Sequence, residues 1–346
     1  MLVKDLMRWF QLNYPHYVDL YKQTNHHYAS NNLNPYHLEG DVWTHLCMTM
    51  LIAERLDEEI GLSDEVKIAV LLHDLGKIET EFRNEETERV SYKGHEGVSV
   101  FRAVEVLNRL ELSDSSKVRI LSLISLHTDL YRMVSDSPDI ENGKINKKFF
   151  DRFKGNRELV QELVYHTMCD GLGRFTDYEG PMSRLDKVLA PYIDKLGEGV
   201  PEVVKPRHVV VMSGLQNSGK TAWVRENLPD YTYLSRDAIV DERAEADGIT
   251  YNESWFKYRD DLDKEFNIRL SKALEARENV VIDKTHMSPK SRNRSIAQFP
   301  KEYKKTCVTV FASYETIQKR EAIRAQAGKS ISQDAYMQLM TAYRIP

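Results

Sequence analysis

A glycine-rich segment placed directly after a run of β-branched residues constrains the fold of this chain more than any other feature. The run is HVVVMS, residues 208–213, and the segment is GLQNSGKT, residues 214–221. The segment fits the spacing G-x-x-x-x-G-K-[ST] between a strand and a helix, which is typical of a P-loop. Such a loop turns backbone N–H groups towards a phosphate, and the helix that follows adds the positive end of its dipole. We therefore expect this segment to bind the phosphates of a nucleotide.

The residues of this segment have separate expected roles. Lys220 is expected to reach the β- and γ-phosphates, and the Thr221 hydroxyl is expected to bind Mg²⁺. The expected cofactor is therefore ATP or another nucleoside triphosphate together with Mg²⁺. The remaining nucleotide-binding candidates in the segment are Gly214, Ser218 and Gly219.

The sequence around the P-loop alternates short β-rich runs with helical ones. After HVVVMS come YTYLS (231–235), NVVID (279–283) and CVTVF (307–311). Alternation of this kind predicts a parallel sheet flanked by helices, which is an α/β fold. We expect this domain to cover residues 207–346.

The N-terminal half has a different periodicity. Apolar residues recur at steps of three and four in 42–56, 66–75, 98–110 and 118–126, which predicts an all-α helical bundle. The stretch KLGEGVPEVVKP concentrates Gly and Pro and has no helical period. We therefore expect a helical domain over residues 1–196 and a linker over 197–206.

Charged residues in the C-terminal half extend the phosphate site. Asp237 follows the run YTYLS and could take the proton of an attacking hydroxyl, or cap a helix. Asp283 ends the next β-rich run, where it could orient Mg²⁺-bound water or an active-site arginine, or be an ordinary strand-end aspartate. Arg320 and Arg324 lie one helical turn apart, so they share a face. They could contact phosphates as part of a lid, or belong to a solvated basic face.

Histidines and aspartates in the N-terminal half indicate a second, metal-dependent site. The adjacent residues His73 and Asp74 can both face one cavity, and Lys77 could neutralise a phosphate there. Imidazole and carboxylate ligands suit Mn²⁺, Co²⁺, Ni²⁺ or a similar ion, which can turn water into hydroxide. Any one histidine could be an ordinary core or surface residue, but the set predicts one or two divalent metals. The candidate ligands are His45, His73, Asp74, His95, His127 and Asp170.

The C-terminal motifs together resemble the 5′-hydroxyl polynucleotide kinase family over residues 207–343. The matching elements are GLQNSGKT, SRD, VIDKTHMS and KR-x-x-x-R-x-x-x-GKS. The resemblance implies that Asp237 is the general base and that Arg320 and Arg324 are lid arginines. Family members often carry an arginine three residues after the base, where this chain has Val240. Arg236 or Arg243 could replace it.

The N-terminal motifs resemble the HD phosphohydrolase superfamily over residues 35–175. The H-x-EGDVW-x-H opening and the D-x-x-GR close are most similar to the HD domain of bacterial tRNA nucleotidyltransferases. The resemblance implies one metal at His45, His73, Asp74 and Asp170, and a second at His95 and His127 with Asp74 bridging. It also implies that His37 and Glu39 orient ligands from outside. We expect the neighbouring pair His26 and His27 to lie on the surface.

The order of the two domains resembles the HD-Pnk family of bacterial and phage RNA end-healing enzymes. The family implies phosphorylation of 5′-OH ends of RNA or DNA and removal of 2′-, 3′- or 2′,3′-cyclic phosphates. The chain has no K-x-D-G motif, so we expect a separate RNA ligase to act with it. Two other functions stay open, namely a small-molecule kinase fused to an HD nucleotide phosphohydrolase, and an NTP-sensing RNA-binding protein.

Composition narrows the class of protein. Hydrophobic residues make up 41% of the 346 residues and charged residues 29%, which is ordinary for a globular protein. No apolar stretch is long enough to span a bilayer, so we expect no membrane partner. Cys47, Cys169 and Cys307 show no CxxC spacing, which fits a reducing, cytoplasmic location.

Overall fold

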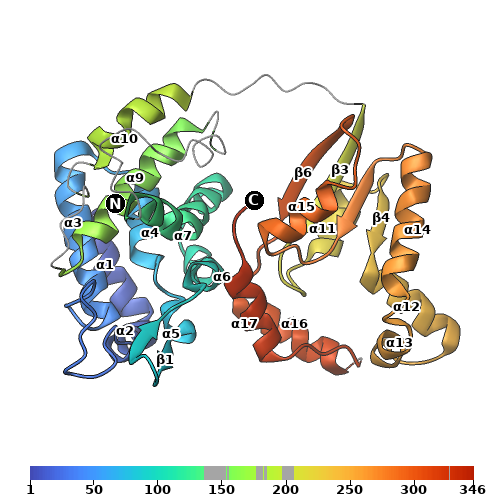
Figure 1. Cartoon of the computed structure of the whole chain (residues 1–346), viewed down its shortest axis with the longest axis horizontal. Helices are drawn as coiled ribbons and strands as arrows, with labels where there is room; N and C mark the ends of the chain where they lie inside the picture. The colour runs from blue at the N-terminus through green and yellow to red at the C-terminus, as the bar shows by residue number, and fades with distance from the viewer. Residues whose placement is uncertain (136–152, 154–155, 177–181, 183–184, 197–205, 327) are drawn as a thin grey trace. The chain divides into compact units, whose positions relative to one another are not determined.

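The chain folds into two compact units. The computed structural model describes all residues except 136–152, 154–155, 177–181, 183–184, 197–205 and 327 (Figure 1). One unit is Met1–Pro201 with Ile345, and the other is Glu202–Arg344 with Pro346. Of the expected linker, 197–206, all but Pro206 lies outside the described residues.

The first unit is a helical bundle, as the sequence predicts. A two-stranded antiparallel hairpin, which the sequence analysis did not predict, interrupts it between α5 and α6. None of the described helices is long and apolar enough to cross a membrane. The elements are α1 (Val3–Asn13), α2 (Pro15–Gln23), α3 (Val42–Ile60), α4 (Asp64–Leu72), α5 (Lys77–Thr80), β1 (Phe82–Asn84), β2 (Arg89–Ser91), α6 (His95–Leu107), α7 (Asp114–Ser135), α9 (Arg157–Leu172), α10 (Leu185–Ile193) and the 3₁₀ turn η3 (Asp194–Leu196).

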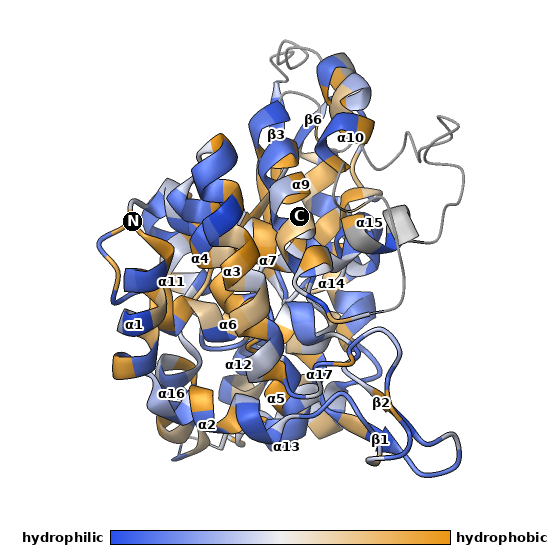
Figure 2. Ribbon diagram, turned by 90° about the vertical axis from the view of Figure 1, so that its left-hand side faces the viewer, coloured by the Kyte–Doolittle hydropathy of each residue, from blue (hydrophilic) through white to orange (hydrophobic). Residues whose placement is uncertain are grey.

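Helix α4 lies at the centre of the bundle. All of its residues from Val66 to Leu72 are buried, and the helix packs against α3, α7 and α9. In Figure 2, much of the ribbon of α3, α6 and α7 is orange, the colour of hydrophobic residues. Local signals fix where α4 begins, because Gly61 ends α3 in the left-handed conformation and Ser63 caps α4 through the Val66 N–H. The residues that follow this helix, His73 and Asp74, therefore lie in the interior of the bundle.

The second unit is an α/β domain with a four-stranded parallel sheet, which also confirms the predicted fold class. The strand order is β4-β5-β3-β6, and Val211 of the central strand pairs with Ile282 on one side and Cys307 on the other. The elements are β3 (Arg207–Ser213), α11 (Lys220–Asn227), β4 (Thr232–Ser235), α12 (Arg236–Asp247), α13 (Tyr251–Tyr258), α14 (Leu262–Glu275), β5 (Val280–Asp283), α15 (Pro289–Ile296), β6 (Tyr303–Thr309), α16 (Tyr314–Gln326) and α17 (Gln333–Ala342).

Both faces of this sheet are buried. Val209 and Val211 of β3 belong to one core cluster, and the alternate residues Val210 and Met212 belong to another. This is why β3 reads as an unbroken apolar run in the sequence. The predicted bounds of the last strand, 307–311, are wrong, because β6 is Tyr303–Thr309. It is an edge strand whose second and third residues are exposed lysines, which hide its start in a pattern search.

The sheet determines where the phosphate site lies. The P-loop follows β3, Ser235 ends β4 and Asp283 ends β5. Because the strands are parallel, their carboxyl ends meet at one edge of the sheet, where ligands bind in folds of this kind.

Candidate functional site

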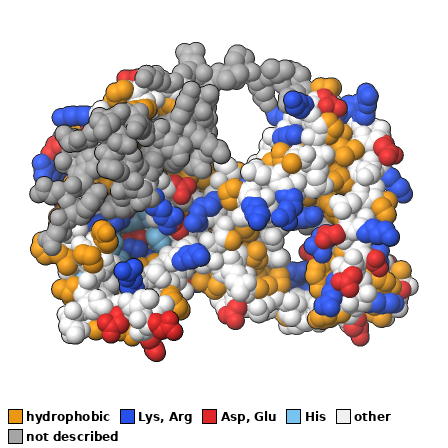
Figure 3. Space-filling view, viewed as in Figure 1, with side chains coloured by type: hydrophobic (Ala, Val, Ile, Leu, Met, Phe, Trp, Pro, Cys, Tyr) orange, Lys and Arg blue, Asp and Glu red, His pale blue; other side chains and the backbone are white. Residues whose placement is uncertain are grey.

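The helical bundle brings the six predicted metal ligands together in its interior. His45 lies on α3, His73 and Asp74 follow α4, His95 begins α6, His127 lies on α7 and Asp170 lies on α9. None of the six is more than 8% exposed. Five separate segments therefore meet at one buried point, which helical periodicity alone did not predict. In the view of Figure 3, pale-blue histidine atoms show in this unit beside acidic and basic side chains.

The first group forms around His45 and His73. His45 Nε2 lies 3.2 Å from Asp170 Oδ1 and 3.7 Å from Asp74 Oδ2. His73 Nε2 lies 3.2 Å from the same Asp74 oxygen. Two imidazole nitrogens thus face two carboxylates across a space small enough for one ion.

The second group shares Asp74 with the first. The other oxygen of Asp74, Oδ1, lies 3.4 Å from His95 Nε2, which in turn lies 3.1 Å from His127 Nε2. Asp74 therefore presents one oxygen to each group, which is the arrangement a bridging ligand needs. A glycine permits this approach, because a Cβ at Gly76 would lie only 2.3 Å from the His95 carbonyl oxygen.

The hydrogen bonds of the histidines leave ligand atoms free. The Nδ1 atoms of His73, His95 and His127 lie 2.7, 2.8 and 2.7 Å from the backbone carbonyls of residues 70, 92 and 124. A carbonyl can only accept, so each Nδ1 donates, and each Nε2 carries a lone pair when its ring is neutral. Facing Nε2 lone pairs in His95 and His127 need a proton or a cation between them.

Unpartnered buried atoms and pKa shifts agree with a cation at this position. His45 Nε2, His73 Nε2 and Asp74 Oδ1 are buried and have no hydrogen-bond partner among the described residues. Burial and the neighbouring charges of His73 and His95 hold the pKa of His127 well below its usual range, so its ring is neutral and able to ligate. These residues therefore fit one or two divalent ions.

Lys77 lies beside the same carboxylate. Its Nζ is 2.8 Å from Asp74 Oδ2 and 5.5 Å from the centre of the Tyr92 ring. Burial opposes ionisation of Asp74, yet the charges of His73 and Lys77 hold its pKa well below the usual range. Lys77 is thus within reach of the centre, with Asp74 as its partner.

Further groups surround the ligands. Glu39 Oε1 accepts a hydrogen bond from His37 Nδ1 at 2.8 Å and lies 3.1 Å from His45 Nδ1, and its other oxygen accepts from the Phe175 N–H at 3.0 Å. Arg174 Nη2 contacts both oxygens of Asp170, at 2.9 and 2.7 Å. These contacts place Glu39 behind a ligand, where carboxylates commonly fix a metal-binding histidine.

The prediction that the pair His26 and His27 lies on the surface is wrong for His26. His26 is 2% exposed and its ring stacks on that of His37 with centroids 3.9 Å apart. His27 is half-buried and accepts a hydrogen bond from the Asn34 N–H. The segment that carries them folds back on itself, since the His26 N–H donates to the Gly40 carbonyl, and this contact leaves no periodic signal in the sequence.

His166 is a further buried histidine that the sequence analysis missed. Its ring is fully buried, 5.4 Å from that of His73 and 5.7 Å from that of His127. Burial and the charge of His73 lower its pKa to about 3, so it is neutral. The signal that could have found it is its position four residues before Asp170 on one face of α9.

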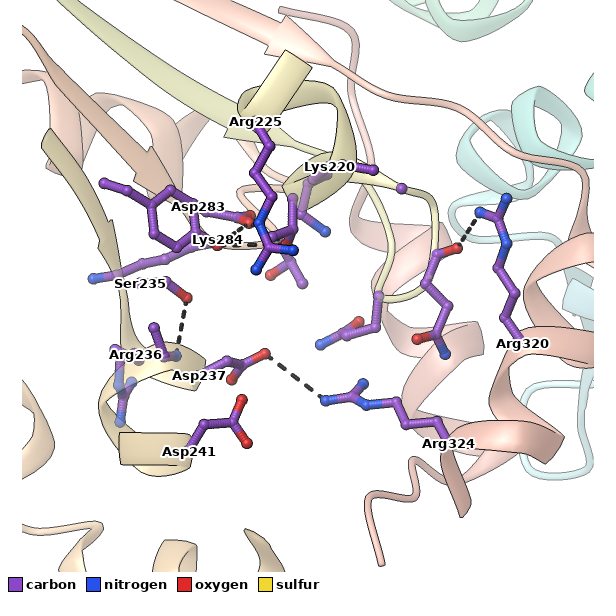
Figure 4. Close-up of a pocket in the computed structure, with 18 of the residues that line it drawn as sticks. Lys220, Arg225, Ser235, Arg236, Asp237, Asp241, Asp283, Lys284, Arg320 and Arg324 are labelled. Carbon is purple, nitrogen blue, oxygen red and sulfur yellow. Dashed lines mark hydrogen bonds and ion pairs between the residues drawn. The ribbon is translucent and has the colours of Figure 1, made fainter. Parts of the chain in front are cut away.

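The α/β unit has a pocket of about 670 Å³ at the carboxyl edge of its sheet (Figure 4). Gly214 and Gly219 of the P-loop have φ angles of +136° and +104°, and a Cβ at Gly214 would lie 2.5 Å from the Val310 carbonyl oxygen. Only glycine fits there. Buried Lys220 donates to the loop carbonyls of Gly214 at 3.1 Å and Leu215 at 2.8 Å. Ser218 is also buried in this loop.

Thr221 and Asp283 meet at the floor of this pocket. The Thr221 hydroxyl donates to Asp283 Oδ2 at 3.0 Å, and the Tyr233 hydroxyl donates to the same oxygen at 2.7 Å. Burial and the Asp283 charge raise the pKa of Tyr233 to about 12, so Tyr233 remains a donor. A hydroxyl and a carboxylate side by side are suited to hold hydrated Mg²⁺.

Asp237 lies across the pocket from the P-loop. It is the second residue of α12, which Ser235 caps, and its side chain is 56% exposed. Tyr251, which the sequence analysis did not single out, donates to Asp237 Oδ1 at 2.8 Å, and Arg324 Nη2 lies 3.9 Å from Oδ2. Arg320, on the same helix α16, donates to the Asn217 carbonyl at 2.8 Å. The structure therefore brings both predicted lid arginines to the pocket.

The position three residues after Asp237 does not reach the pocket. Val240 is fully buried and packs in a core cluster of the sheet. Of the two predicted replacements, Arg236 lines the pocket, whereas the Arg243 guanidinium lies over the Tyr258 ring, 4.6 Å from its centre, and is not among the lining residues.

Comparisons with known proteins identify both domains. A family model described as HD domain matches residues 42–189, and one described as AAA domain matches residues 209–346. An A-adding tRNA nucleotidyltransferase of Deinococcus radiodurans is 27% identical over an alignment of 187 residues, and the match covers 51% of this chain. The match covers 38% of that relative's length. The chain thus carries an HD phosphohydrolase domain followed by a P-loop, kinase-like domain, whereas the end-healing family stays a prediction.

Proposed function

We propose that this protein is a bifunctional end-healing enzyme that acts on RNA ends. Its α/β unit transfers the γ-phosphate of ATP to a 5′-OH end, and its helical unit removes a 2′-, 3′- or 2′,3′-cyclic phosphate. The observation that carries the proposal is the pairing, in one chain, of a buried two-group His/Asp centre with a P-loop pocket that holds an exposed carboxylate.

The pocket residues support phosphoryl transfer to a hydroxyl. The P-loop and Lys220 would hold the β- and γ-phosphates, while Thr221 and Asp283 would hold Mg²⁺. Asp237 would accept the proton of the attacking 5′-hydroxyl, because its exposed carboxylate faces the space beyond the P-loop. Arg320 and Arg324 would neutralise charge on the phosphoryl group as it moves between oxygens.

The helical unit supports hydrolysis of a phosphate ester. His45, His73, Asp74 and Asp170 would hold one divalent metal ion, and His95 and His127 would hold a second with Asp74 between the two. A bound ion of this kind supplies a hydroxide near neutral pH. Lys77 would meet the negative charge of the phosphate, and Glu39 would keep His45 oriented. The nitrogen-rich ligands favour Mn²⁺, Co²⁺ or Ni²⁺.

The choice of RNA rests on two supports outside the geometry. The motifs resemble those of RNA end-healing enzymes, and the relative that matches about half of this chain is named for an activity on tRNA. The two activities together would yield ends ready for joining, so we propose that a separate RNA ligase completes the repair.

One incubation tests this function. The protein is mixed with γ-labelled ATP, Mg²⁺ and Mn²⁺, and a short RNA that carries a 5′-OH and a 3′-phosphate, and both ends are then analysed. We expect label at the 5′ end and loss of the 3′-phosphate. Parallel reactions with a DNA oligonucleotide and with nucleosides separate the acceptor classes. Labelling of nucleosides alone would replace end healing by a small-molecule kinase, and no transfer to any acceptor would favour a nucleotide-sensing protein.

A further inference from the structure

We propose that Arg236 and Lys284 form an anion site that holds the phosphodiester following the first nucleoside of the acceptor strand. Trp255 positions Arg236 in this site. The inference rests on the proposed kinase function and specifies how its acceptor is recognised. It assigns the acceptor contact to two residues outside the P-loop and the lid.

The site lies at one end of the pocket. Arg236, Trp255 and Lys284 all line it, together with Asp237. In Figure 4, Arg236 and Lys284 lie on one side of Asp237, whereas Arg320 and Arg324 lie on the other. A nucleotide bound at the P-loop would lie on the side of Asp237 where Arg320 and Arg324 lie. The first side is left for the molecule whose hydroxyl Asp237 deprotonates.

The two cations lack a buried counter-charge. Lys284 is half-buried and makes no ion pair with any described residue, and its Nζ lies 3.8 Å from the centre of the Phe266 ring. Arg236 Nε is buried without a hydrogen-bond partner in the described chain, and the nearest carboxylate, 3.4 Å away, belongs to Asp263, whose side chain is 69% exposed. Burial first, and then the charge of Arg236, lower the pKa of Lys284, so the two cations repel each other. An anion between them would relieve this repulsion.

Arg236 is held in place for such a contact. Its guanidinium lies over the indole of Trp255, 5.3 Å from the ring centre, and α12 begins at this residue directly after β4. Stacking leaves the edge of a guanidinium able to donate two parallel hydrogen bonds to phosphate oxygens. Arg236 and Asp237 are adjacent in the chain. A phosphate bound at Arg236 therefore places the hydroxyl of the same nucleoside close to Asp237.

This arrangement predicts the class of acceptor. A 5′-hydroxyl at Asp237 with a phosphate at Arg236 and Lys284 requires an acceptor that carries a phosphate on the 3′ side of its first nucleoside. A dinucleoside monophosphate is the smallest such acceptor with a phosphodiester, and a free nucleoside would leave the anion site empty. In the transfer, the bond between the γ-phosphorus and the β,γ-bridging oxygen breaks and a bond from the γ-phosphorus to the 5′-oxygen forms. The hydroxyl proton passes to Asp237 and ADP leaves. The anion site itself takes no part in bond changes.

The test compares two acceptors in the full chain. Adenylyl-(3′→5′)-adenosine has an internal phosphodiester that an end phosphatase leaves intact, and adenosine has none. KM and kcat are measured for both with the wild type, Arg236→Ala, Lys284→Ala and Arg236→Lys. Arg243→Ala is the matched control, because Arg243 lies on the same helix outside the pocket. Affinity for a non-hydrolysable Mg²⁺–ATP analogue is measured by calorimetry for each.

We expect the wild type to prefer the dinucleotide. Arg236→Ala and Lys284→Ala should each raise KM for the dinucleotide about 10- to 100-fold, in the range of a lost charge-assisted contact, with Arg236→Lys between wild type and Ala. Adenosine kinetics, analogue affinity and Arg243→Ala should stay unchanged. If the dinucleotide KM of both folded alanine variants equals that of the wild type, the anion site is wrong while the kinase function stands.

A binding measurement keeps the two proposals separable. If the wild type phosphorylates neither acceptor, the proposed function fails, and dinucleotide binding to the analogue-bound protein decides the anion site. Weaker binding to Arg236→Ala and Lys284→Ala than to Arg243→Ala would support the site, and equal binding would overturn it. Circular dichroism checks that each variant folds. If Arg236→Ala does not fold, the result for Lys284→Ala decides the test.

Discussion

The two candidate sites differ in how far the protein completes them by itself. The six metal-ligand candidates of the helical unit are at most 8% exposed, and their carboxylates face histidines and Lys77. In the α/β unit, the Asp237 side chain is 56% exposed, and among the described residues it meets Arg324 Nη2, at 3.9 Å, and the Tyr251 hydroxyl. The charged groups of the first site are buried and paired with one another, whereas Asp237 of the second site is exposed to an incoming substrate.

This difference follows from what each site must bind. Taking a carboxylate out of water is costly unless nearby opposite charges offset the loss, so a buried centre needs its histidines and Lys77 in position beforehand. The phosphate pocket receives several negative charges with its nucleotide. Lys220 therefore donates to loop carbonyls, Arg320 donates to a carbonyl, and Arg324 lies beside a carboxylate. We expect the phosphates of a bound nucleotide to replace these partners. We expect the metal centre to be sensitive to any single ligand and the pocket to tolerate changes at its margin.

The largest expected effect is loss of a shared ligand. Asp74→Ala should lower phosphate removal by about 10³-fold or more, because each of the two ligand groups loses one oxygen. The metal ions that would supply the hydroxide would then be lost or misplaced. Phosphorylation of 5′-OH ends should be unchanged. The measurement is release of the 3′-phosphate from RNA, with and without prior treatment with a chelator and addition of Mn²⁺, Co²⁺, Ni²⁺ or Mg²⁺.

His16→Ala is the control for this loss, because His16 is an exposed histidine on α2. Chelation should abolish phosphate removal by the wild type, and a transition metal should restore it. Full activity of Asp74→Ala would break the contrast between the sites, since it would show that the buried cluster is not catalytic. Restoration by Mg²⁺ alone would keep the enzyme but contradict the ligand argument.

Loss of the expected base comes next. Asp237→Ala should slow 5′ phosphorylation by about 10²- to 10⁴-fold, the usual range for a general base. Phosphate removal should stay intact, because the residue belongs to the other unit. Rates of both reactions are compared with those of Asp230→Ala, which changes an exposed aspartate outside the pocket. Equal loss of both activities in a folded protein would contradict two independent sites.

The same contrast explains what could be predicted from sequence. The P-loop is local, so eight consecutive residues reveal it, and the pair His73 and Asp74 is local too. His26 and Tyr251 reach the sites through tertiary contacts that leave no spacing pattern, whereas His166 leaves only its spacing of four residues from Asp170. The predicted ligands could be named because several fall on apolar helical runs, where a charged residue is unusual.

A smaller effect is expected behind the metal centre. Glu39→Gln keeps the size of the side chain and removes its charge, which lies 3.1 Å from His45 Nδ1. Outer carboxylates of this kind contribute about 10- to 100-fold to metal affinity. We expect Mn²⁺ to bind that much more weakly in calorimetry, with 5′ phosphorylation unchanged. Glu85→Gln, at an exposed position, is the control, and an unchanged Mn²⁺ affinity would remove Glu39 from the site.

The smallest effect is expected at the margin of the open pocket. Burial and the Asp237 carboxylate raise the pKa of Tyr251, so the phenol keeps its proton and donates to Asp237 Oδ1. Tyr251→Phe removes this one hydrogen bond, worth about 1 kcal/mol in a site open to water, and should lower kcat for 5′ phosphorylation about fivefold.

Tyr258→Phe is the matched control for this change, because Tyr258 lies on the same helix α13 and its hydroxyl donates to Asp247 outside the pocket. KM for ATP should be the same in both variants, since Tyr251 contacts the base and not the P-loop. A loss of 10²-fold or more in Tyr251→Phe would mean that the pocket depends on its resting contacts as the metal centre does. The contrast between a closed site and an open one would then fail, because Asp237 would need a fixed partner before any substrate arrives.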